Sequence, residues 1–279
     1  MVNAAMTDVT TQRVMRRLGR ATPWCFWGEL PSRPRSAPRA WLQRRQYAPL
    51  AAARAIVAVG ERARQTYAEM IPGVRTFNQP YACRLDDFEA AAAQRMPNAE
   101  PVFIFCGQMI ARKGIDLLLS AFAMLVRDGV AARLELVGRE AELPALLAAL
   151  PDAARRRITY RGFLAPVDLP AVFARADVFV LPSRHDGWGV VVNQALGAGL
   201  PVIASDAVGA AHDLVEPDVS GLIVPSGDAP ALAVALRRLA ESPAMRARLG
   251  AAAALRAKAL TPDRAAQFWE ELAGTFVTG

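Results

Sequence analysis

Two stretches of the sequence combine the residue types and spacings that could bind a charged ligand. The first, residues 107–114, reads GQMIARKG and places Arg112 and Lys113 between two glycines. We expect a strand before it and a helix after it. The free N–H groups at the start of that helix, together with the two cations, predict a cradle for an anion. The glycine spacing matches neither a Walker A loop nor GxGxxG, and a solvated Arg-Lys pair is the competing interpretation.

The second stretch, residues 182–201, is the most informative in the chain and reads PSRHDGWGVVVNQALGAGLP. Two glycines bracket Trp188, so backbone N–H groups can approach a ligand closely there. Asp186 and Gln194 are eight positions apart, slightly over two helical turns, and we expect both to face the same side of a crevice. Each could bind a pair of sugar or ribose hydroxyls, although an Asp before a helix often serves only as its cap.

Other kinds of reaction centre find little support. The two histidines, His185 and His212, show no Ser-His-Asp spacing and no cluster of metal ligands, so hydrolysis by a triad or by zinc is disfavoured. The three cysteines are far apart and lack CxxC spacing, which argues against a zinc site or a disulfide framework and indicates a reducing cytoplasm. The two stretches above therefore remain the candidates for function.

The elements that must position these stretches are short apolar strands alternating with helices. Strands are expected at 102–106, 134–137, 158–160, 178–181, 201–204 and 221–224, and helices at 116–125, 143–150, 169–174, 190–198 and 229–241. This alternation predicts an α/β fold with a parallel sheet covered on both faces. In such sheets ligands bind at the carboxyl ends of the strands, where both stretches lie.

The front of the chain has a different composition. Residues 1–50 contain nine Arg and two acidic residues, so the whole net charge of +7 lies there. Such a segment could attract an anionic membrane or a polyanion, or remain a solvated surface. We do not expect regular structure at 31–40, PSRPRSAPRA, because Pro fixes φ and removes a hydrogen-bond donor. No apolar run is long enough for a membrane span, and the first residues lack the apolar core of a secretory signal.

The motifs from residue 102 to 240 occur in an order that resembles the C-terminal half of glycosyltransferase family 4, retaining enzymes of the GT-B fold. The resemblance implies one complete C-terminal Rossmann-like domain at 99–260, which binds the nucleotide sugar. It also implies a partial N-terminal, acceptor-side Rossmann-like domain at 1–98. The segment TPDRAAQFWEEL, within 261–279, is similar to the family's terminal helix that crosses back to the N-terminal domain. Most of the family's N-terminal domain has no counterpart, so we expect a truncated or mis-started chain.

Carried over by position, the resemblance implies roles for individual residues. Lys113 would hold the donor diphosphate, Asp186 would contact the donor sugar and Gln194 the ribose. Lys113 and Asp186 are then the candidate catalytic residues. The other donor-binding candidates are Gln108, Arg112, Phe163, Leu164, Gly187, Trp188, Gly189, Val190 and Val191. The family motif E-x7-E reads D-x7-Q here, and Gln108 replaces a frequent cation, for which we expect Arg112 to substitute.

The resemblance also implies a reaction. A sugar would pass from a nucleoside-diphosphate sugar to a hydroxyl of a saccharide or lipid-linked acceptor, with retention and without a required metal or cofactor. The expected setting is surface polysaccharide or lipopolysaccharide synthesis by a bacterial, cytoplasmic protein, peripheral at the inner face of the plasma membrane. A donor-binding pseudoenzyme and a GT-B nucleotide-sugar epimerase are the alternatives. Nucleic acid is not an expected partner, because the basic excess is local and no recognised module accompanies it.

Overall fold

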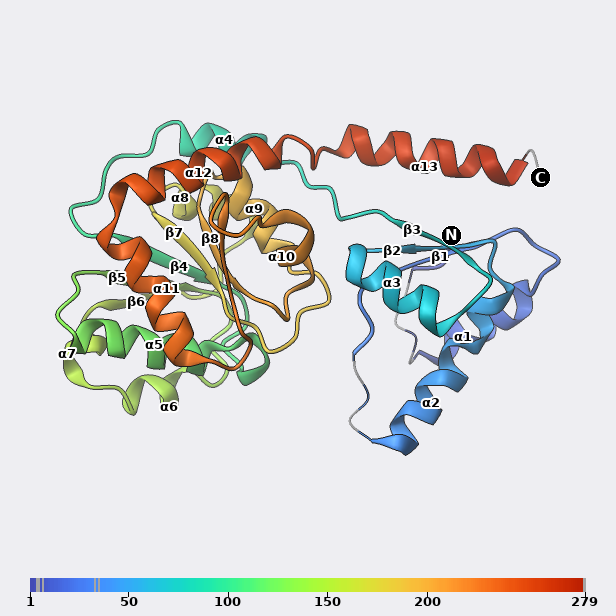
Figure 1. Ribbon diagram of the computed structural model, residues 1–279, viewed down its shortest axis with the longest axis horizontal. Coiled ribbons are helices and arrows are strands. Elements are labelled where there is room, and N and C mark those ends of the chain that lie inside the picture. The colour runs from blue at the N-terminus through green and yellow to red at the C-terminus, as the bar shows by residue number, and fades with distance from the viewer. Residues whose placement is uncertain (4–5, 7, 33, 35, 278–279) are drawn as a thin grey trace. The chain divides into compact units, whose positions relative to one another are not determined.

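The computed structural model describes residues 1–3, 6, 8–32, 34 and 36–277, which form two compact units (Figure 1). The smaller unit comprises Met1–Tyr81 and Pro262–Gly279, and the larger comprises Ala82–Thr261. Each unit is built on its own parallel sheet. Among the described residues, none of the helices has the length and apolar content needed to cross a bilayer.

The larger unit contains a six-stranded parallel sheet with the order β6-β5-β4-β7-β8-β9. Its strands are β4 (Val102–Cys106), β5 (Arg133–Val137), β6 (Ile158–Tyr160), β7 (Val178–Leu181), β8 (Val202–Ser205) and β9 (Gly221–Val224). The chain builds outward from β4 to β6 and then returns to place β7 on the other side of β4. Loops that leave β4 and β7 therefore diverge at the switch point of the sheet, where α/β proteins bind ligands.

Helices cover both faces of this sheet, so its central strands are buried throughout, as parallel strands usually are. The helices are α4 (Asp86–Ala92), α5 (Ile115–Arg127), α6 (Leu143–Ala148), α7 (Asp152–Arg155), α8 (Leu169–Phe173), α9 (Val191–Gly197), α10 (Gly209–Leu214), α11 (Ala229–Glu241) and α12 (Pro243–Ala257), with 3-10 turns η2 (Ala111–Lys113) and η3 (Pro166–Asp168). The α/β fold with a parallel sheet that the sequence predicts is confirmed.

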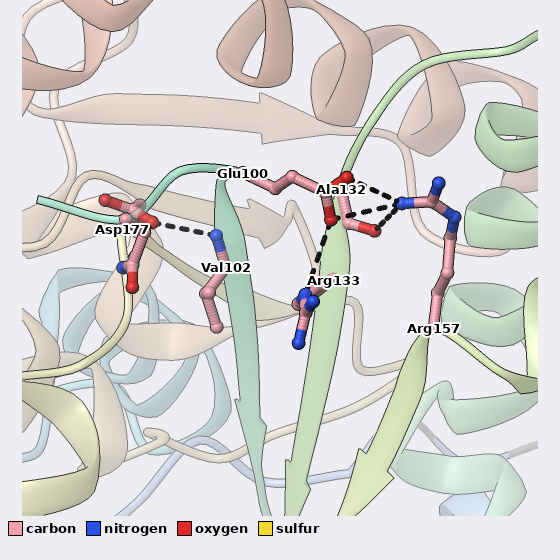
Figure 2. Close-up of polar contacts among 7 residues, drawn as sticks. Glu100, Val102, Ala132, Arg133, Arg157 and Asp177 are labelled. Carbon is pink, nitrogen blue, oxygen red and sulfur yellow. Dashed lines mark hydrogen bonds and ion pairs between the residues drawn. The ribbon is translucent and has the colours of Figure 1, made fainter.

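Charged side chains tie the strands together at the amino-terminal edge of this sheet. Figure 2 shows Glu100 between Arg133 and Arg157, with Glu100 oxygens 3.3 Å from Arg133 Nε and 3.2 Å from Arg157 Nη1. The same Arg157 nitrogen donates to the carbonyl oxygen of Ala132 at 3.3 Å. These contacts fix the starts of β4, β5 and β6, and the opposite edge is left to the loops.

The smaller unit contains a three-stranded parallel sheet with the order β1-β2-β3. Its elements are α1 (Val9–Leu18), β1 (Cys25–Gly28), α2 (Ala37–Tyr47), η1 (Ala48–Ala52), β2 (Ala55–Ala58), α3 (Glu61–Met70), β3 (Arg75–Asn78) and α13 (Pro262–Val277). One face of the sheet packs under Met15, Leu50 and Tyr67. On the other face, Leu272 of α13 packs against residues of β1 and β2.

Two expectations from the sequence need correction. The domain boundary lies after Tyr81 and not at 98, because α4 joins the larger unit, where the rings of Phe88 and Phe173 meet edge to face at 5.4 Å. The Pro-rich segment 31–40 also contains regular structure, since α2 begins at Ala37. A proline in the first turn of a helix costs no hydrogen bond, and this explains why Pro38 is tolerated there.

We predict that Phe88→Ala destabilises the protein by about 3–5 kcal/mol, the usual cost of deleting a buried ring. Met96→Ala, in the same segment but at an exposed position, should change stability by less than about 0.5 kcal/mol. Urea unfolding followed by circular dichroism measures both. Equal and small effects would show that residues 82–98 do not belong to the core of the larger unit.

Candidate functional site

Three loops meet at the carboxyl edge of the larger sheet, following β4 (residues 107–114), β7 (182–190) and β8 (206–208). The first and second loops are joined by a backbone hydrogen bond from Arg184 N to the carbonyl oxygen of Arg112, at 2.8 Å. The Arg112 side chain also donates a hydrogen bond of 3.2 Å, from Nη1 to the carbonyl oxygen of His185. Arg112 is therefore held against the second loop by both its backbone and its side chain.

The second and third loops are joined through the backbone of Asp186. Its N–H donates to the carbonyl oxygen of Ala207 at 3.1 Å, and its own carbonyl oxygen accepts from Gly209 N at 3.1 Å. The carbonyl oxygen of Trp188 accepts from Ala210 N at 2.8 Å. Asp186 thus lies in a short β-bridge with Val208, which fixes the direction of its side chain.

The centre of the site is an ion pair between the first two loops. Lys113 Nζ lies 2.5 Å from Asp186 Oδ2, and the two side chains are only 17% and 10% exposed. A charge pair so enclosed is less screened than a surface pair. An ammonium carries three donors, so Lys113 can hold this carboxylate and an incoming phosphate oxygen together.

Close backbone approach makes this contact possible. Gly114 has φ +73°, and a Cβ added there would lie 2.1 Å from the carbonyl oxygen of Pro182. Gly189 has φ +91°, and an added Cβ would lie 3.1 Å from Val208 Cγ1 and 3.2 Å from Leu181 Cδ2. Both positions therefore need glycine, which lets the chain pass tightly beside the ion pair.

Backbone donors lie next to the ion pair. The N–H groups of Gly187, Gly189, Val190 and Val191 donate to no acceptor within the described ranges of the chain. Val191 begins α9, which ends at Gly197 and has fewer than two full turns. A helix this short contributes mainly the hydrogen bonds of its free N–H groups, as helix starts generally do. The loop thus offers several donors to an anion.

Trp188 supports the loop from within and does not reach into solvent. Its side chain is fully buried, and its Nε1 donates to Asn193 Oδ1 at 3.0 Å. That bond ties the loop to α9. Its indole therefore keeps the glycines on either side in place.

The prediction that helical spacing aligns Asp186 with Gln194 is wrong. Helical spacing cannot align the two, because Asp186 lies in a β-bridge and α9 begins only at Val191. Gln194 nevertheless has a feature of a binding residue. Its Oε1 is buried and accepts no hydrogen bond from any residue that the structure describes. A buried acceptor without a donor is costly, and a ligand hydroxyl would satisfy it.

The remaining sequence candidates lie at the rim. Gln108 is exposed in the first loop, and Phe163 and Leu164 follow β6, two strands away from β4. The guanidinium of Arg139 lies over the Phe163 ring, 5.6 Å from its centroid. The structure thus brings Arg112, Lys113, Asp186 and the backbone that follows together and leaves Phe163 and Leu164 outside this cluster.

Sequence reasoning missed a second ion pair beside the first. Arg184 binds both carboxylate oxygens of Asp116, at 2.6 and 2.7 Å. This hydrogen bonding lowers the pKa of Asp116 below its usual value and raises that of Arg184. The two residues are 68 positions apart, and no motif connects them. The only available signal was their place beside Lys113 and Asp186.

Cys106, the last residue of β4, lies directly before the first loop. Burial raises the pKa of its thiol to about 11, and the nearby Lys113 lowers it by less. The thiol therefore stays protonated at neutral pH. A protonated, buried thiol is a poor nucleophile, so Cys106 contributes packing to the site.

We predict that Gly114→Ala destabilises the protein more than Gly162→Ala. Both glycines have similar positive φ, +73° and +76°, so alanine costs roughly 1–2 kcal/mol of backbone strain at either. Only at Gly114 would the new Cβ also collide with Pro182, because nothing lies within 4 Å at Gly162. Thermal unfolding compares the two variants, and equal shifts would show that the tight passage beside Pro182 is absent.

Comparison with known proteins assigns the chain to a family. The family model described as glycosyl transferases group 1 matches residues 100–242, just over half of the chain. Alpha-D-kanosaminyltransferase of Streptomyces kanamyceticus is 29% identical over 157 residues, 55% of this chain and 40% of the relative. A GDP-mannose-dependent alpha-mannosyltransferase of Mycobacterium tuberculosis is 35% identical over 132 residues, 47% of this chain and 32% of the relative. The matches span less than half the length of these curated relatives.

Solved structures share the fold over nearly the whole chain. The sucrose-phosphate synthase of Thermosynechococcus elongatus superposes with a TM-score of 0.78 and 26% identity, covering 97% of this chain and 72% of that one. Anabaena Alr3699/HepE, solved in complex with UDP, gives 0.73 with 19% identity and covers 95% and 74%. The fold is therefore the GT-B type with Rossmann-like parallel sheets. The ordered loops, the fold and the family model lead to one conclusion: the chain belongs to the group 1 glycosyl transferases.

Proposed function

We propose that the larger unit binds a nucleoside-diphosphate sugar and that the protein transfers its sugar to an acceptor hydroxyl. The observation that carries the proposal is the meeting of Lys113, Asp186 and the free N–H groups around Gly189 at the carboxyl edge of the sheet. These groups supply a cation for a diphosphate, a carboxylate for sugar hydroxyls and donors for phosphate oxygens. Relatives whose names specify sugar transfer from GDP-mannose support the same reading.

The chemistry follows from where charge develops. The bond between the anomeric carbon and the β-phosphate oxygen breaks, and a bond between that carbon and the acceptor oxygen forms on the same face, which retains the configuration. The acceptor proton passes to the departing diphosphate. Lys113, Arg112 and the N–H groups stabilise the charge gathering on that diphosphate, and one such contact is typically worth about 2.7–4 kcal/mol in the barrier. No step requires a metal ion.

The resting ion pair gives donor binding an exchange step. Asp186 occupies one donor of the Lys113 ammonium in the free protein. When a diphosphate approaches Lys113, the two anions share or compete for the ammonium. Asp186 then has lone pairs available for hydroxyls of the donor sugar. The buried Oε1 of Gln194 takes a ribose hydroxyl, and Gln108, Phe163 and Leu164 border the rest of the nucleotide.

The acceptor in this proposal is a saccharide or a lipid-linked sugar, reached at an anionic membrane. Helix α2 of the smaller unit supports the membrane contact, because none of its residues is buried and Trp41 and Leu42 are both exposed. The Arg45 guanidinium lies 5.0 Å from the Trp41 ring centroid. The Arg residues of α2 would attract an anionic lipid surface, and Trp41 and Leu42 would insert beside them. Surface polysaccharide or lipopolysaccharide synthesis is the process we propose.

We predict that Lys113→Ala lowers binding of UDP or GDP at least tenfold and removes sugar transfer. The chain contains one other lysine, Lys258, and Lys258→Ala is the matched control that should bind as wild type. Calorimetry measures binding, and circular dichroism checks that the variants fold. The melting temperature of Lys113→Ala should fall, because Asp186 loses its counter-charge.

Undiminished binding and transfer in folded Lys113→Ala would overturn the assignment of the site. Nucleotide binding by the wild type without transfer to any saccharide or lipid acceptor would instead identify a donor-binding pseudoenzyme. Conversion of one donor sugar into another without an acceptor would identify an epimerase. Analysis of the sugar products separates these outcomes.

For the membrane contact, we predict that the double variant Trp41→Ser, Leu42→Ser binds phosphatidylglycerol vesicles more weakly than wild type. Burying two large apolar side chains is worth about 1.5–3 kcal/mol each at full burial, so the loss should exceed tenfold. The control Val167→Ser, at an exposed position of the larger unit, should bind as wild type. Vesicle sedimentation measures the effect, and equal sedimentation of both variants would contradict it.

A further inference from the structure

Two ion pairs of opposite polarity connect the same two segments of the site. Lys113 of the first loop pairs with Asp186, and Asp116, three residues after Lys113, pairs with Arg184, two residues before Asp186. Each segment therefore carries one positive and one negative partner. Only the first pair contains residues to which the proposed function gives a direct contact with the donor.

The second pair is the more extensively bonded of the two. Arg184 donates to both oxygens of Asp116, at 2.6 and 2.7 Å, and its Nη1 also donates to the carbonyl oxygen of Ala111 at 2.6 Å. Its backbone N–H adds the bond to Arg112 already described. Arg184 thus contacts residues on both sides of Lys113 in the chain, Ala111 and Arg112 before it and Asp116 of α5 after it. Such bidentate guanidinium contacts add geometric specificity to their energy.

In the proposed function the diphosphate shares the Lys113 ammonium with Asp186, so the spacing of the two loops then depends more on their other contacts. We propose that Arg184 and Asp116 are a positioning pair that keeps Lys113 and Asp186 at the spacing the donor requires. This inference rests on the proposed function, because it concerns the same donor site. The pair itself touches no substrate in this account.

A positioning role differs from a stabilising one in what its loss changes. The side chains of Arg184 and Asp116 are 37% and 34% exposed, and pairs this exposed contribute little to the stability of a fold. Removing a group that orients a ligand-binding residue, in contrast, commonly lowers affinity by about 10–100-fold, as is known for groups that hydrogen-bond the ligands of metal ions. We therefore expect a loss of affinity with little change in melting temperature.

The chain offers a matched control at the opposite edge of the sheet. Arg157 also donates to both oxygens of a carboxylate, that of Glu100, and to a backbone carbonyl, that of Ala132 (Figure 2). Its side chain is 37% exposed and that of Glu100 is 31% exposed, close to the values for Arg184 and Asp116. Arg157→Gln removes a comparably exposed arginine–carboxylate pair far from the carboxyl ends of the strands, although Arg157 forms its pair through the single nitrogen Nη1.

The experiment compares Arg184→Gln with Arg157→Gln in the full chain. Calorimetric titration with UDP and, separately, GDP measures affinity, and thermal unfolding measures stability. We expect Arg184→Gln to bind the better of the two nucleotides at least tenfold more weakly than wild type, whereas Arg157→Gln binds as wild type. Reversing the pair, with Arg184→Asp and Asp116→Arg together, should recover part of the loss. In a Lys113→Ala background, Arg184→Gln should cause no further loss.

Wild-type affinity in Arg184→Gln, equal losses in both Gln variants, or an additive loss on top of Lys113→Ala would each overturn the positioning role. If Arg184→Gln does not fold, Arg184→Lys, which keeps the charge and loses the bidentate geometry, is judged by the same criteria. The result is separable from the proposed function. Loss of binding in Lys113→Ala with none in Arg184→Gln rejects the positioning pair alone, whereas full binding in Lys113→Ala rejects the donor site itself.

Discussion

The contact between the Lys113 ammonium and the Asp186 carboxylate is the interaction on which the carboxyl edge of the larger unit depends. Its two partners come from different loops and are almost enclosed by protein. An enclosed charge without a partner is costly, so each residue constrains the loop of the other. The same pair also holds the two charges that a diphosphate sugar needs, one for its phosphates and one for its hydroxyls. The same ion pair therefore contributes both to the stability of the two loops and to the recognition of the ligand.

The sheet order makes this contact possible. Because β7 returns to the side of β4, the loops that follow these two strands leave from neighbouring positions. Gly114 has no side chain, so the first loop can pass close to Pro182 of the second loop. At the opposite edge, Glu100 and the arginines beside it fix where the strands begin. The strands are thus tied at one end, and the other end presents the loops with their charges.

Much of this arrangement could be predicted from the sequence. The six strands of the larger sheet follow from short apolar runs, and the two loops follow from glycines placed after strands 4 and 7. The domain boundary could not be placed, because a short helix such as α4 carries no sign of the core it joins. The role of Trp188 was also hidden. The flanking glycines indicate a close approach of the backbone, and only the fold shows that the indole between them is buried.

Long-range pairing was the hardest to predict. Nothing in the composition links Arg184 to Asp116, because the pairing exists only after β7 is placed beside β4. The helical prediction for Gln194 failed for a related reason. Asp186, in the loop before α9, forms a β-bridge to the third loop and is not part of the helix. Local patterns indicate which elements form, and the contacts between loops depend on the order of the strands.

The most direct test of the account observes Lys113 itself. The chain has two lysines, so protein labelled with 15N at the lysine side chains should give two ammonium signals in a nuclear magnetic resonance spectrum at low temperature. We predict that saturating UDP or GDP shifts one signal, that this signal is missing in Lys113→Ala, and that the signal of Lys258 stays in place. Nucleotide binding that moves neither signal, or that moves the one surviving in Lys113→Ala, would contradict the account.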